Sequence, residues 1–172
     1  MNSPELDKCG NCKAEVTTDS DFCPHCGVLF EHTPILACET DFDQEAIGVC
    51  IICRKRVCER CCEVKSKRMF CPEHNKVEVS QDWARVFQAD NMLETELMRA
   101  FLASLGIPVV MQERGASYHG ALIGAVDPRA RERLRHPSKV FVPIPEYLKA
   151  IEHLQSWNSA QAIGESFETD NT

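Results

Sequence analysis

Four cysteines fall within twelve residues in the stretch CIICRKRVCERC, residues 50–61, as two Cys-x-x-Cys pairs separated only by Arg-Lys-Arg-Val. All 11 cysteines of the 172-residue chain lie before residue 72. Such pairs serve as disulfides, redox pairs or metal ligands. An odd cysteine count suits a complete disulfide framework poorly, and the amino terminus has no basic and apolar signal segment. We therefore expect metal ligands in a cytoplasmic protein.

The chain changes character near residues 73–82, where the cysteine-rich half gives way to ordinary apolar patterning. Within the first half, the cysteine-free stretch VLFEHTPILA separates two cysteine blocks. We expect small modules at 1–30 and 36–76, a globular domain at 82–157 and a flexible polar tail at 158–172. No apolar run reaches the roughly 18 to 20 residues that a membrane span needs, so no membrane insertion is expected.

The first block holds two Cys-x-x-Cys pairs separated by ten residues, a spacing typical of one tetrahedral zinc site. Gly10 and Gly27 stand where a metal knuckle needs close backbone approach or a positive φ. The stretch resembles the minimal zinc ribbons found at the ends of many bacterial regulatory proteins. We expect the metal to replace a core that about 25 residues cannot build. The predicted ligands are Cys9, Cys12, Cys23 and Cys26.

The second block offers eight potential ligands in four pairs, enough for two closed tetrahedral sites. One ion bound by the dense stretch alone would leave only four linking residues to bring the two pairs face to face, so we favour interleaved pairing. The pairs are Cys38 with Asp41, Cys50 with Cys53, Cys58 with Cys61, and Cys71 with His74.

This order resembles the B-box zinc finger, in which the first and third pairs bind one ion and the second and fourth bind the other. The resemblance implies one site of Cys38, Asp41, Cys58 and Cys61 and another of Cys50, Cys53, Cys71 and His74. Asp41 departs from the family pattern, which more often has cysteine or histidine there, and Glu39, Cys62 or His32 could replace it. With the ribbon, this predicts three zinc ions per chain. No position is left for water, so the ions are expected to be structural.

The globular half opens with WARVFQA, residues 83–89, which favours a strand. A helix is expected next, because Asn91 and Glu94 form a capping box before apolar residues at helical spacing. Gly106 and Pro108 are expected to end this helix.

Three further strands and a second amphipathic helix are predicted after this helix. The order β-α-β-β-β-α favours a two-layer α+β sandwich of ferredoxin-like type. The residues LMRAFLASLGIPVVM and VFVPIPEYLKAIEHL resemble a small bacterial family of signal-transducing proteins with a PII-like fold. The strands are expected at 107–111, 121–126 and 139–145, and the helix at 146–157.

The sequence shows no nucleophile, base and acid set and no phosphate-loop lysine, so we do not expect an enzyme. The expected function is that of a noncatalytic zinc-binding adaptor or regulatory protein in bacterial signal transduction, with a protein partner and candidate homo-oligomerisation through the carboxy-terminal domain. One alternative is a sensor that binds an anionic metabolite near residues 114–119 or the arginine-rich segment at 127–138. Nucleic-acid binding through the basic clusters at 54–56 and 65–68 is disfavoured by the net charge of −7.

Overall fold

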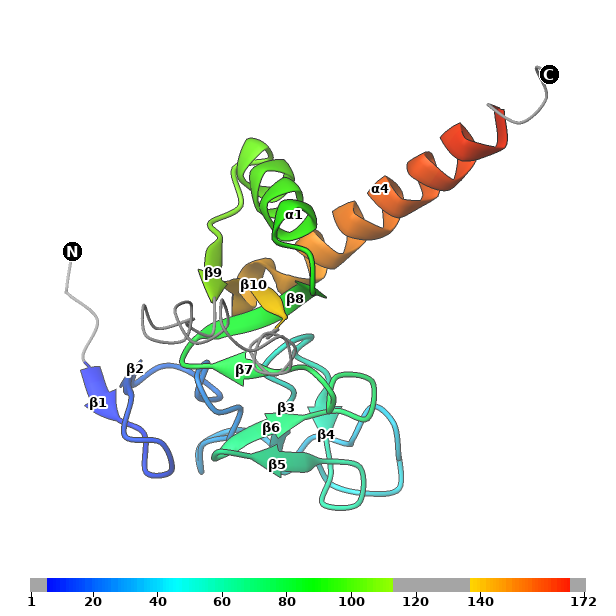
Figure 1. Cartoon of the computed structure of the whole chain (residues 1–172). Helices are drawn as coiled ribbons and strands as arrows, with labels where there is room; N and C mark the ends of the chain where they lie inside the picture. Colours follow the sequence, from blue (N-terminus) through cyan, green and yellow to red (C-terminus); the bar gives the residue numbers. More distant parts are fainter. Residues whose placement is uncertain (1–5, 113–136, 168–172) are drawn as a thin grey trace, which may run out of the picture. The chain divides into compact units, whose positions relative to one another are not determined.

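The computed structural model describes residues 6–112 and 137–167. The chain divides into two compact units, and the boundary falls between Val77 and Glu78. All cysteines lie in the first unit, and every described helix lies in the second (Figure 1). Among the described residues, no helix combines the length and the apolar character needed to cross a membrane.

Several sequence predictions fall outside the described residues. These are the strand at 121–126, the candidate ligand loop at 114–119 and nearly all of the arginine-rich segment at 127–138.

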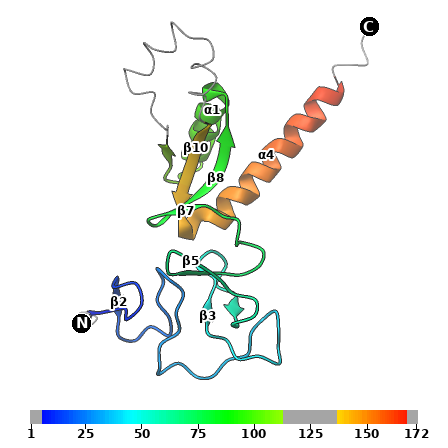
Figure 2. The same cartoon turned by 60° about the horizontal axis from the view of Figure 1, so that its bottom comes forward.

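The first unit contains three short antiparallel hairpins, which pair β1 with β2, β3 with β4 and β5 with β6. Figure 2 shows that irregular loops connect these short strands. Strands of two or three residues cannot build a core by themselves, and buried cysteines make up much of the interior instead. The strands are β1 Leu6–Lys8, β2 Glu15–Thr17, β3 Gly48–Val49, β4 Arg56–Val57, β5 Glu63–Lys65 and β6 Arg68–Phe70.

The two cysteine blocks, predicted as separate modules, are joined by backbone hydrogen bonds within the first unit. The amide of Val49 donates to the carbonyl of Gly27 at 2.7 Å, and the amide of Met69 donates to the carbonyl of Cys26 at 2.9 Å. An isolated antiparallel bridge also pairs Val28 with Gly48. The residues between the blocks therefore do not act as a free linker.

The second unit contains a four-stranded sheet in the order β7-β8-β10-β9. Because β10 is antiparallel to both β8 and β9, those two strands run parallel to each other on either side of it. Helix α1, Met92–Ser104, connects β8 to β9. This split βαβ arrangement is compatible with an α+β sandwich. The strands are β7 Val79–Ser80, β8 Trp83–Ala89, β9 Val110–Gln112 and β10 Ser138–Pro143.

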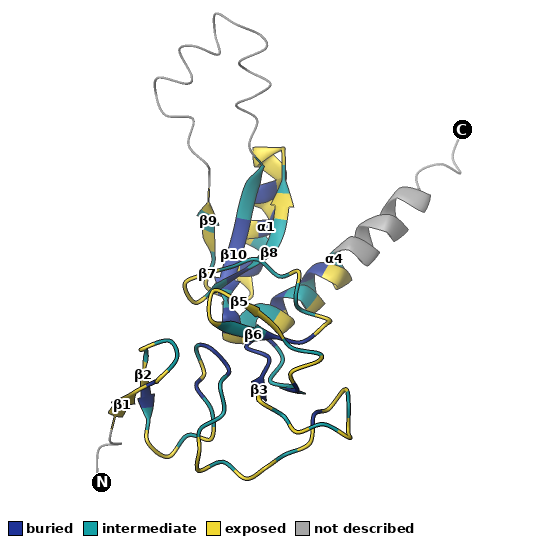
Figure 3. Cartoon of the chain, turned by 90° about the horizontal axis from the view of Figure 1, so that it is seen from below, coloured by how far each residue is buried: buried dark blue, intermediate teal, exposed yellow. Residues whose placement is uncertain are grey.

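Helices α1 and α4 both pack against β8 and β10 and share one apolar core with them. A short 3-10 helix, η1 (Ile144–Glu146), leads from β10 into α4, Tyr147–Phe167. The rings of Phe101 and Trp157 bring the two helices into contact, with centroids 4.4 Å apart. Figure 3 shows how burial concentrates along β10. The fully formed core consists of Met98, Leu102, Ile107, Val140, Val142, Ala150 and Leu154.

The first half of this unit follows the sequence prediction closely. Strand β8 spans the predicted residues, and Asn91 caps α1 by accepting a hydrogen bond from the amide of Leu93 at 2.9 Å. Strand β9, however, starts at Val110 rather than at residue 107. The cause is the helix terminus, since Ile107 still donates its amide to the carbonyl of Leu102 and its side chain is buried in the core.

The second half departs further from the prediction. Strand β10 ends at Pro143, because residues 144–146 form the 3-10 helix. Helix α4 was expected to end at Trp157, but its backbone remains helical to Phe167, inside the segment predicted as a tail. The two-residue strand β7 was not predicted, because so short a segment has no readable period.

Candidate metal centres

The ribbon cysteines converge as the sequence predicts they should. The thiol sulfurs of Cys9, Cys12, Cys23 and Cys26 all lie within 4.8 Å of one another. Cys9 Sγ lies 3.7 Å from Cys26 Sγ, and Cys12 Sγ lies 3.6 Å from Cys23 Sγ. All but Cys12 are buried. We call these four residues the ribbon group.

A second set of four side chains converges from the middle and the end of the second block. Cys53 Sγ lies 3.7 Å from Cys71 Sγ, and the Nδ1 atom of His74 lies 3.1 Å from Cys71 Sγ and 4.0 Å from Cys50 Sγ. These four ligand atoms also lie within 4.8 Å of one another. We call Cys50, Cys53, Cys71 and His74 the inner group; it combines the second pair with the fourth.

The remaining thiols form a third set, the outer group, of Cys38, Cys58 and Cys61. Cys61 Sγ lies 3.4 Å from Cys38 Sγ and 3.5 Å from Cys58 Sγ. Cys38 of the first pair thus meets the third pair, and the dense stretch at residues 50–61 contributes to two groups at once. Because this stretch supplies ligands to two groups, its cysteines lie close together in the sequence.

Asp41, the predicted fourth ligand of the outer group, is not among the ligand atoms that lie within 4.8 Å of one another. Its Oδ2 atom lies 3.4 Å from Nη1 of Arg60, while its amide donates to Cys38 Sγ at 3.4 Å. Its backbone is therefore at the edge of the group while its carboxylate is paired with an arginine. The role of Asp41 as a ligand stays a prediction.

Two of the three alternatives to Asp41, Glu39 and His32, have side chains engaged elsewhere. Glu39 accepts from the amide of Arg56 at 3.2 Å and pairs with its guanidinium at 3.4 Å. The Nε2 atom of His32 lies 2.9 Å from the carbonyl oxygen of Ser20. Cys62 donates its amide to the carbonyl of Cys58 at 2.9 Å, which places it in the turn that carries a ligand.

The sulfur spacings fit a bound metal better than they fit disulfides. A disulfide needs about 2.05 Å between its sulfurs, and all 11 cysteines are free thiols at longer spacings. Four sulfurs at about 2.3 Å from a tetrahedral zinc ion lie about 3.8 Å apart. The observed separations of 3.4 to 3.7 Å are close to that value. Each of the three groups could therefore hold a metal ion, and zinc suits their thiol and imidazole donors.

Three of the cysteine turns share one backbone geometry. In each, the first cysteine's carbonyl accepts from the amide four residues later, as in Lys13 to Cys9 at 2.9 Å and Arg54 to Cys50 at 2.9 Å. That later residue has a positive φ, 65° at Lys13, 63° at Arg54 and 86° at Gly27. The geometry turns both thiols of a pair to the same side, as a tetrahedral ion requires.

The thiols of each group differ in how readily they ionise. Burial opposes ionisation of Cys9, but backbone amides of its own turn outweigh it and lower its pKa to about 7. The pKa of Cys38 is lowered to about 7 by amides of its turn against the same opposition. A hydrogen bond with Cys53 lowers the pKa of Cys50 to about 4.

The pKa values of neighbouring thiols in the same groups shift in the opposite direction. Burial raises the pKa of Cys61 to about 12, and the hydrogen bond with Cys50 raises the pKa of Cys53. Burial likewise raises the pKa of Cys23 and Cys26. Clustered thiols thus resist ionising together, and a bound cation relieves that resistance by supplying positive charge.

The first basic cluster, residues 54–56, makes contacts inside the first unit. Arg54 lies over the ring of Phe22 at 5.4 Å from its centroid and donates to the carbonyl of Pro24 at 3.2 Å. Lys55 pairs with Glu73 at 2.7 Å. With Arg56 paired to Glu39, these side chains tie loops together.

The second basic cluster, residues 65–68, behaves similarly. Lys65 pairs with Glu63 at 2.9 Å, and the Nζ atom of Lys67 lies 3.5 Å from the carbonyl oxygen of Asn11. In return, the side-chain amide of Asn11 donates to the carbonyl of Lys67 at 3.1 Å. The cluster therefore connects the ribbon to hairpin β5–β6.

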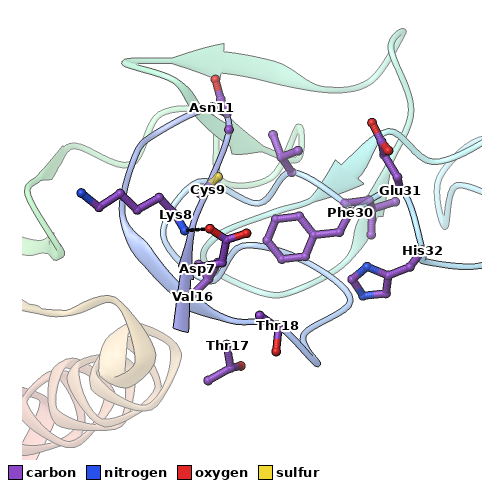
Figure 4. Close-up of a pocket in the computed structure, with 13 residues that line it drawn as sticks. Asp7, Lys8, Cys9, Asn11, Val16, Thr17, Thr18, Phe30, Glu31 and His32 are labelled. Carbon is purple, nitrogen blue, oxygen red and sulfur yellow. Dashed lines mark hydrogen bonds between the residues drawn. The ribbon is translucent and has the colours of Figure 1, made fainter. Parts of the chain in front are cut away.

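A cavity of ≈ 530 Å³ opens beside the ribbon group, between hairpin β1–β2 and residues 28–32 (Figure 4). Its wall includes Phe30 and His32, whose rings stack with centroids 5.9 Å apart. His32, one of the alternatives to Asp41, therefore lines this cavity.

No protein-family model, curated protein or solved structure matches the chain. The likenesses to zinc ribbons, B-box fingers and PII-like signal-transducing proteins accordingly remain predictions from the sequence. The geometry itself defines only a general class of protein: a chain with three cysteine-rich groups able to hold metal ions, followed by a unit compatible with an α+β sandwich.

Proposed function

We propose that the chain is a noncatalytic zinc-binding adaptor or regulatory protein that acts through protein–protein contacts in bacterial signalling. The single observation that carries this proposal is the convergence of the cysteines into three compact groups within one small unit. Two groups supply four protein ligands each, so an ion there would have no open position for a substrate or water. Ions held in this way would stabilise a recognition unit rather than perform chemistry.

In this proposal, Asp41 completes the outer group, and three zinc ions bind per chain. Zinc is the ion favoured by these donors, because thiolate and imidazole ligands in a tetrahedral arrangement suit it. The basic side chains support a protein partner over a nucleic acid. Those named above in both clusters have intramolecular partners, and the net charge of −7 repels polyanions.

The second unit would supply self-association or a second docking surface. On helix α1, Leu93 and Leu97 are 75% and 46% exposed, and their four-residue spacing places them on one face. We propose this face as the route to a homo-oligomer. Light scattering on the full chain would test it, because a Leu93→Glu, Leu97→Glu variant should then be monomeric.

The adaptor function is tested by asking what the full chain binds in cells of its native host. The tagged wild type should enrich a small set of proteins at near-stoichiometric levels by quantitative mass spectrometry. A Cys53→Ser, Cys71→Ser variant, which removes two inner-group ligands, should lose them. The same purified zinc-loaded chain should turn over no substrate. Failure to enrich any protein, or a zinc-dependent turnover, would overturn the proposal.

A further inference from the structure

Residues 35–47 fold back on themselves as an irregular hairpin, which we call the outer hairpin. The amide of Ala46 donates to the carbonyl of Leu36 at 2.8 Å, and the amide of Cys38 donates to the carbonyl of Gln44 at 2.9 Å. A hydrogen bond of 3.0 Å from the amide of Gln44 to the carbonyl of Asp41 closes the turn. The segment is therefore held by its own backbone on both sides of the turn.

Its side chains alternate between two faces, as extended backbone requires. One face is anchored at the outer group, since Cys38 is fully buried there and Leu36, Gln44 and Ala46 are half-buried. The other face points to solvent. Its members, which we call the exposed face, are Ile35, Ala37, Glu45 and Ile47.

The exposed face carries large apolar groups that the first unit does not use. The antiparallel bridge between Ala37 and Glu45 sets Ile35 opposite Ile47, and these two side chains are 80% and 42% exposed. Phe42, in the turn, is 77% exposed. Single exposed apolar residues are ordinary, but a facing isoleucine pair and a turn phenylalanine on one anchored hairpin form a candidate contact surface.

The charge around these apolar groups has one sign. From residue 35 to residue 47 there is no lysine or arginine. Of the acidic side chains, Glu39 and Asp41 are paired with arginines. Asp43 and Glu45 are exposed, and neither forms an ion pair with any residue that the structure describes.

We propose that the outer hairpin is a docking surface for a cationic, amphipathic segment of a partner protein, in which lysine or arginine alternates with large apolar residues. This inference rests on the proposed adaptor function and names the chemistry of its partner. The apolar side chains of the partner would cover Ile35, Ile47 and Phe42, while its cations would meet Asp43 and Glu45.

The negative charge of the outer hairpin disfavours the other partners that could cover it. A nucleic acid or an anionic membrane surface would be repelled by the uncompensated carboxylates. A second copy of the chain, docked by a two-fold axis, would set this acidic surface against itself. Only a cationic partner gains from both the apolar and the charged parts of the surface.

The test uses the full-length, zinc-loaded, ¹⁵N-labelled chain and a short blocked synthetic peptide in which arginine alternates with leucine and phenylalanine. Amide shifts should move chiefly within residues 35–47. Affinity should fall at least about tenfold in Asp43→Lys, Glu45→Lys and in Ile35→Ser, Ile47→Ser. It should change less than about twofold in the matched charge control Asp19→Lys, Glu152→Lys, whose two acids are exposed elsewhere. Each variant must keep its zinc count and the remaining amide spectrum.

Three results of this experiment would overturn the assignment. They are shifts that map outside residues 35–47, an equal loss of affinity in the charge control, and hairpin shifts that depend on protein concentration without peptide, which would mean self-association. A natural partner that binds through other residues, unaffected by the hairpin variants, would also overturn it and would leave the adaptor function standing. The adaptor function itself would fail if the chain bound no protein at all or turned over a substrate in a zinc-dependent way.

Discussion

The backbone of Met69 connects two of the cysteine groups: its amide donates to the carbonyl of Cys26 at 2.9 Å, and its own carbonyl accepts from the amide of Ile51 at 3.0 Å. Cys26 belongs to the ribbon group, and Ile51 lies between two cysteines of the inner group. One residue therefore links the two turns through backbone hydrogen bonds. We expect sites that share such a support to be energetically coupled.

This connection predicts that the ribbon and inner groups bind metal cooperatively. Replacing a ribbon ligand, as in Cys9→Ser, should loosen the Met69 contacts and weaken zinc binding at the inner group by roughly 5- to 150-fold, the usual range of coupling between sites. Stepwise competition with a chromophoric chelator, followed by native mass spectrometry, would measure it. Unchanged affinity at the inner group would show that the two sites are independent.

Gly27 lies at a close approach between the joined blocks. Its φ is +86°, and a Cβ there would lie 2.1 Å from the carbonyl oxygen of Val49. Gly27→Ala should therefore cost about 1–3 kcal/mol from backbone strain, with the steric clash added, and should lower zinc affinity at the ribbon group. Thermal unfolding of the zinc-loaded chain would measure the loss.

Substitutions at two other glycines distinguish the effect of backbone strain from that of the steric clash. Gly106 has a φ of +75° but open space around its missing Cβ, so Gly106→Ala should show the strain alone, in the second unit. Gly10 has no atom within 4 Å of that position and no positive φ, so Gly10→Ala should be nearly silent. Equal effects at Gly27 and Gly106 would mean that the contact with Val49 contributes nothing.

The comparison of these turns shows what could be predicted from the sequence. The Cys-x-x-Cys spacing predicts a turn and its ligands, because the metal chemistry is local. The sequence also singled out Gly10 and Gly27 for close backbone approach or a positive φ, which was right for Gly27 and wrong for Gly10. Lys13 and Arg54 adopt the same positive-φ conformation without being glycine. Residue 27 must be glycine because the carbonyl of Val49, from the other block, lies where a Cβ would be. That contact is tertiary and has no local signal.

The same division between local and tertiary information runs through the second unit. Strand β8, helix α1 and the Asn91 cap were predictable, because period and capping are local. The late start of β9 was not, because Ile107 is held by the end of α1 and by the core. Likewise, the carboxylate of Asp41 pairs with Arg60, which comes from another ligand turn.

The core of the second unit should be independent of metal. Leu102 is fully buried, so Leu102→Ala should cost about 2–5 kcal/mol through lost contacts and a cavity. Leu97→Ala, on the same helix but 46% exposed, is the matched control and should cost much less.

Hydrogen exchange with a chelator present should show loss of protection in residues 6–77 and retained protection in the second unit. Collapse of both units on chelation would contradict this.

The zinc count tests the role of Asp41. Native mass spectrometry with elemental analysis should find three zinc ions per chain in the wild type. Asp41→Ala should lose or greatly weaken the third ion, because Cys38, Cys58 and Cys61 alone leave one tetrahedral position unfilled. Asp43→Ala removes a nearby exposed carboxylate and should keep all three. A full count in Asp41→Ala would assign the fourth position to another ligand.

Acidification should weaken metal binding in a window set by the thiols. The pKa of Cys9 in the folded chain is about 7, below the ordinary thiol value of 9.0, so folding favours its thiolate. The resulting stabilisation is complete above about pH 9 and is lost as pH falls through about 7. Because zinc ligands must be deprotonated, affinity at the ribbon group should fall in the same direction. Chelator competition at several pH values would measure this fall. Calorimetry in buffers of different ionisation enthalpy should show proton release on zinc binding that grows as pH drops, and pH-independent affinity through this window would show that Cys9 is not a ligand.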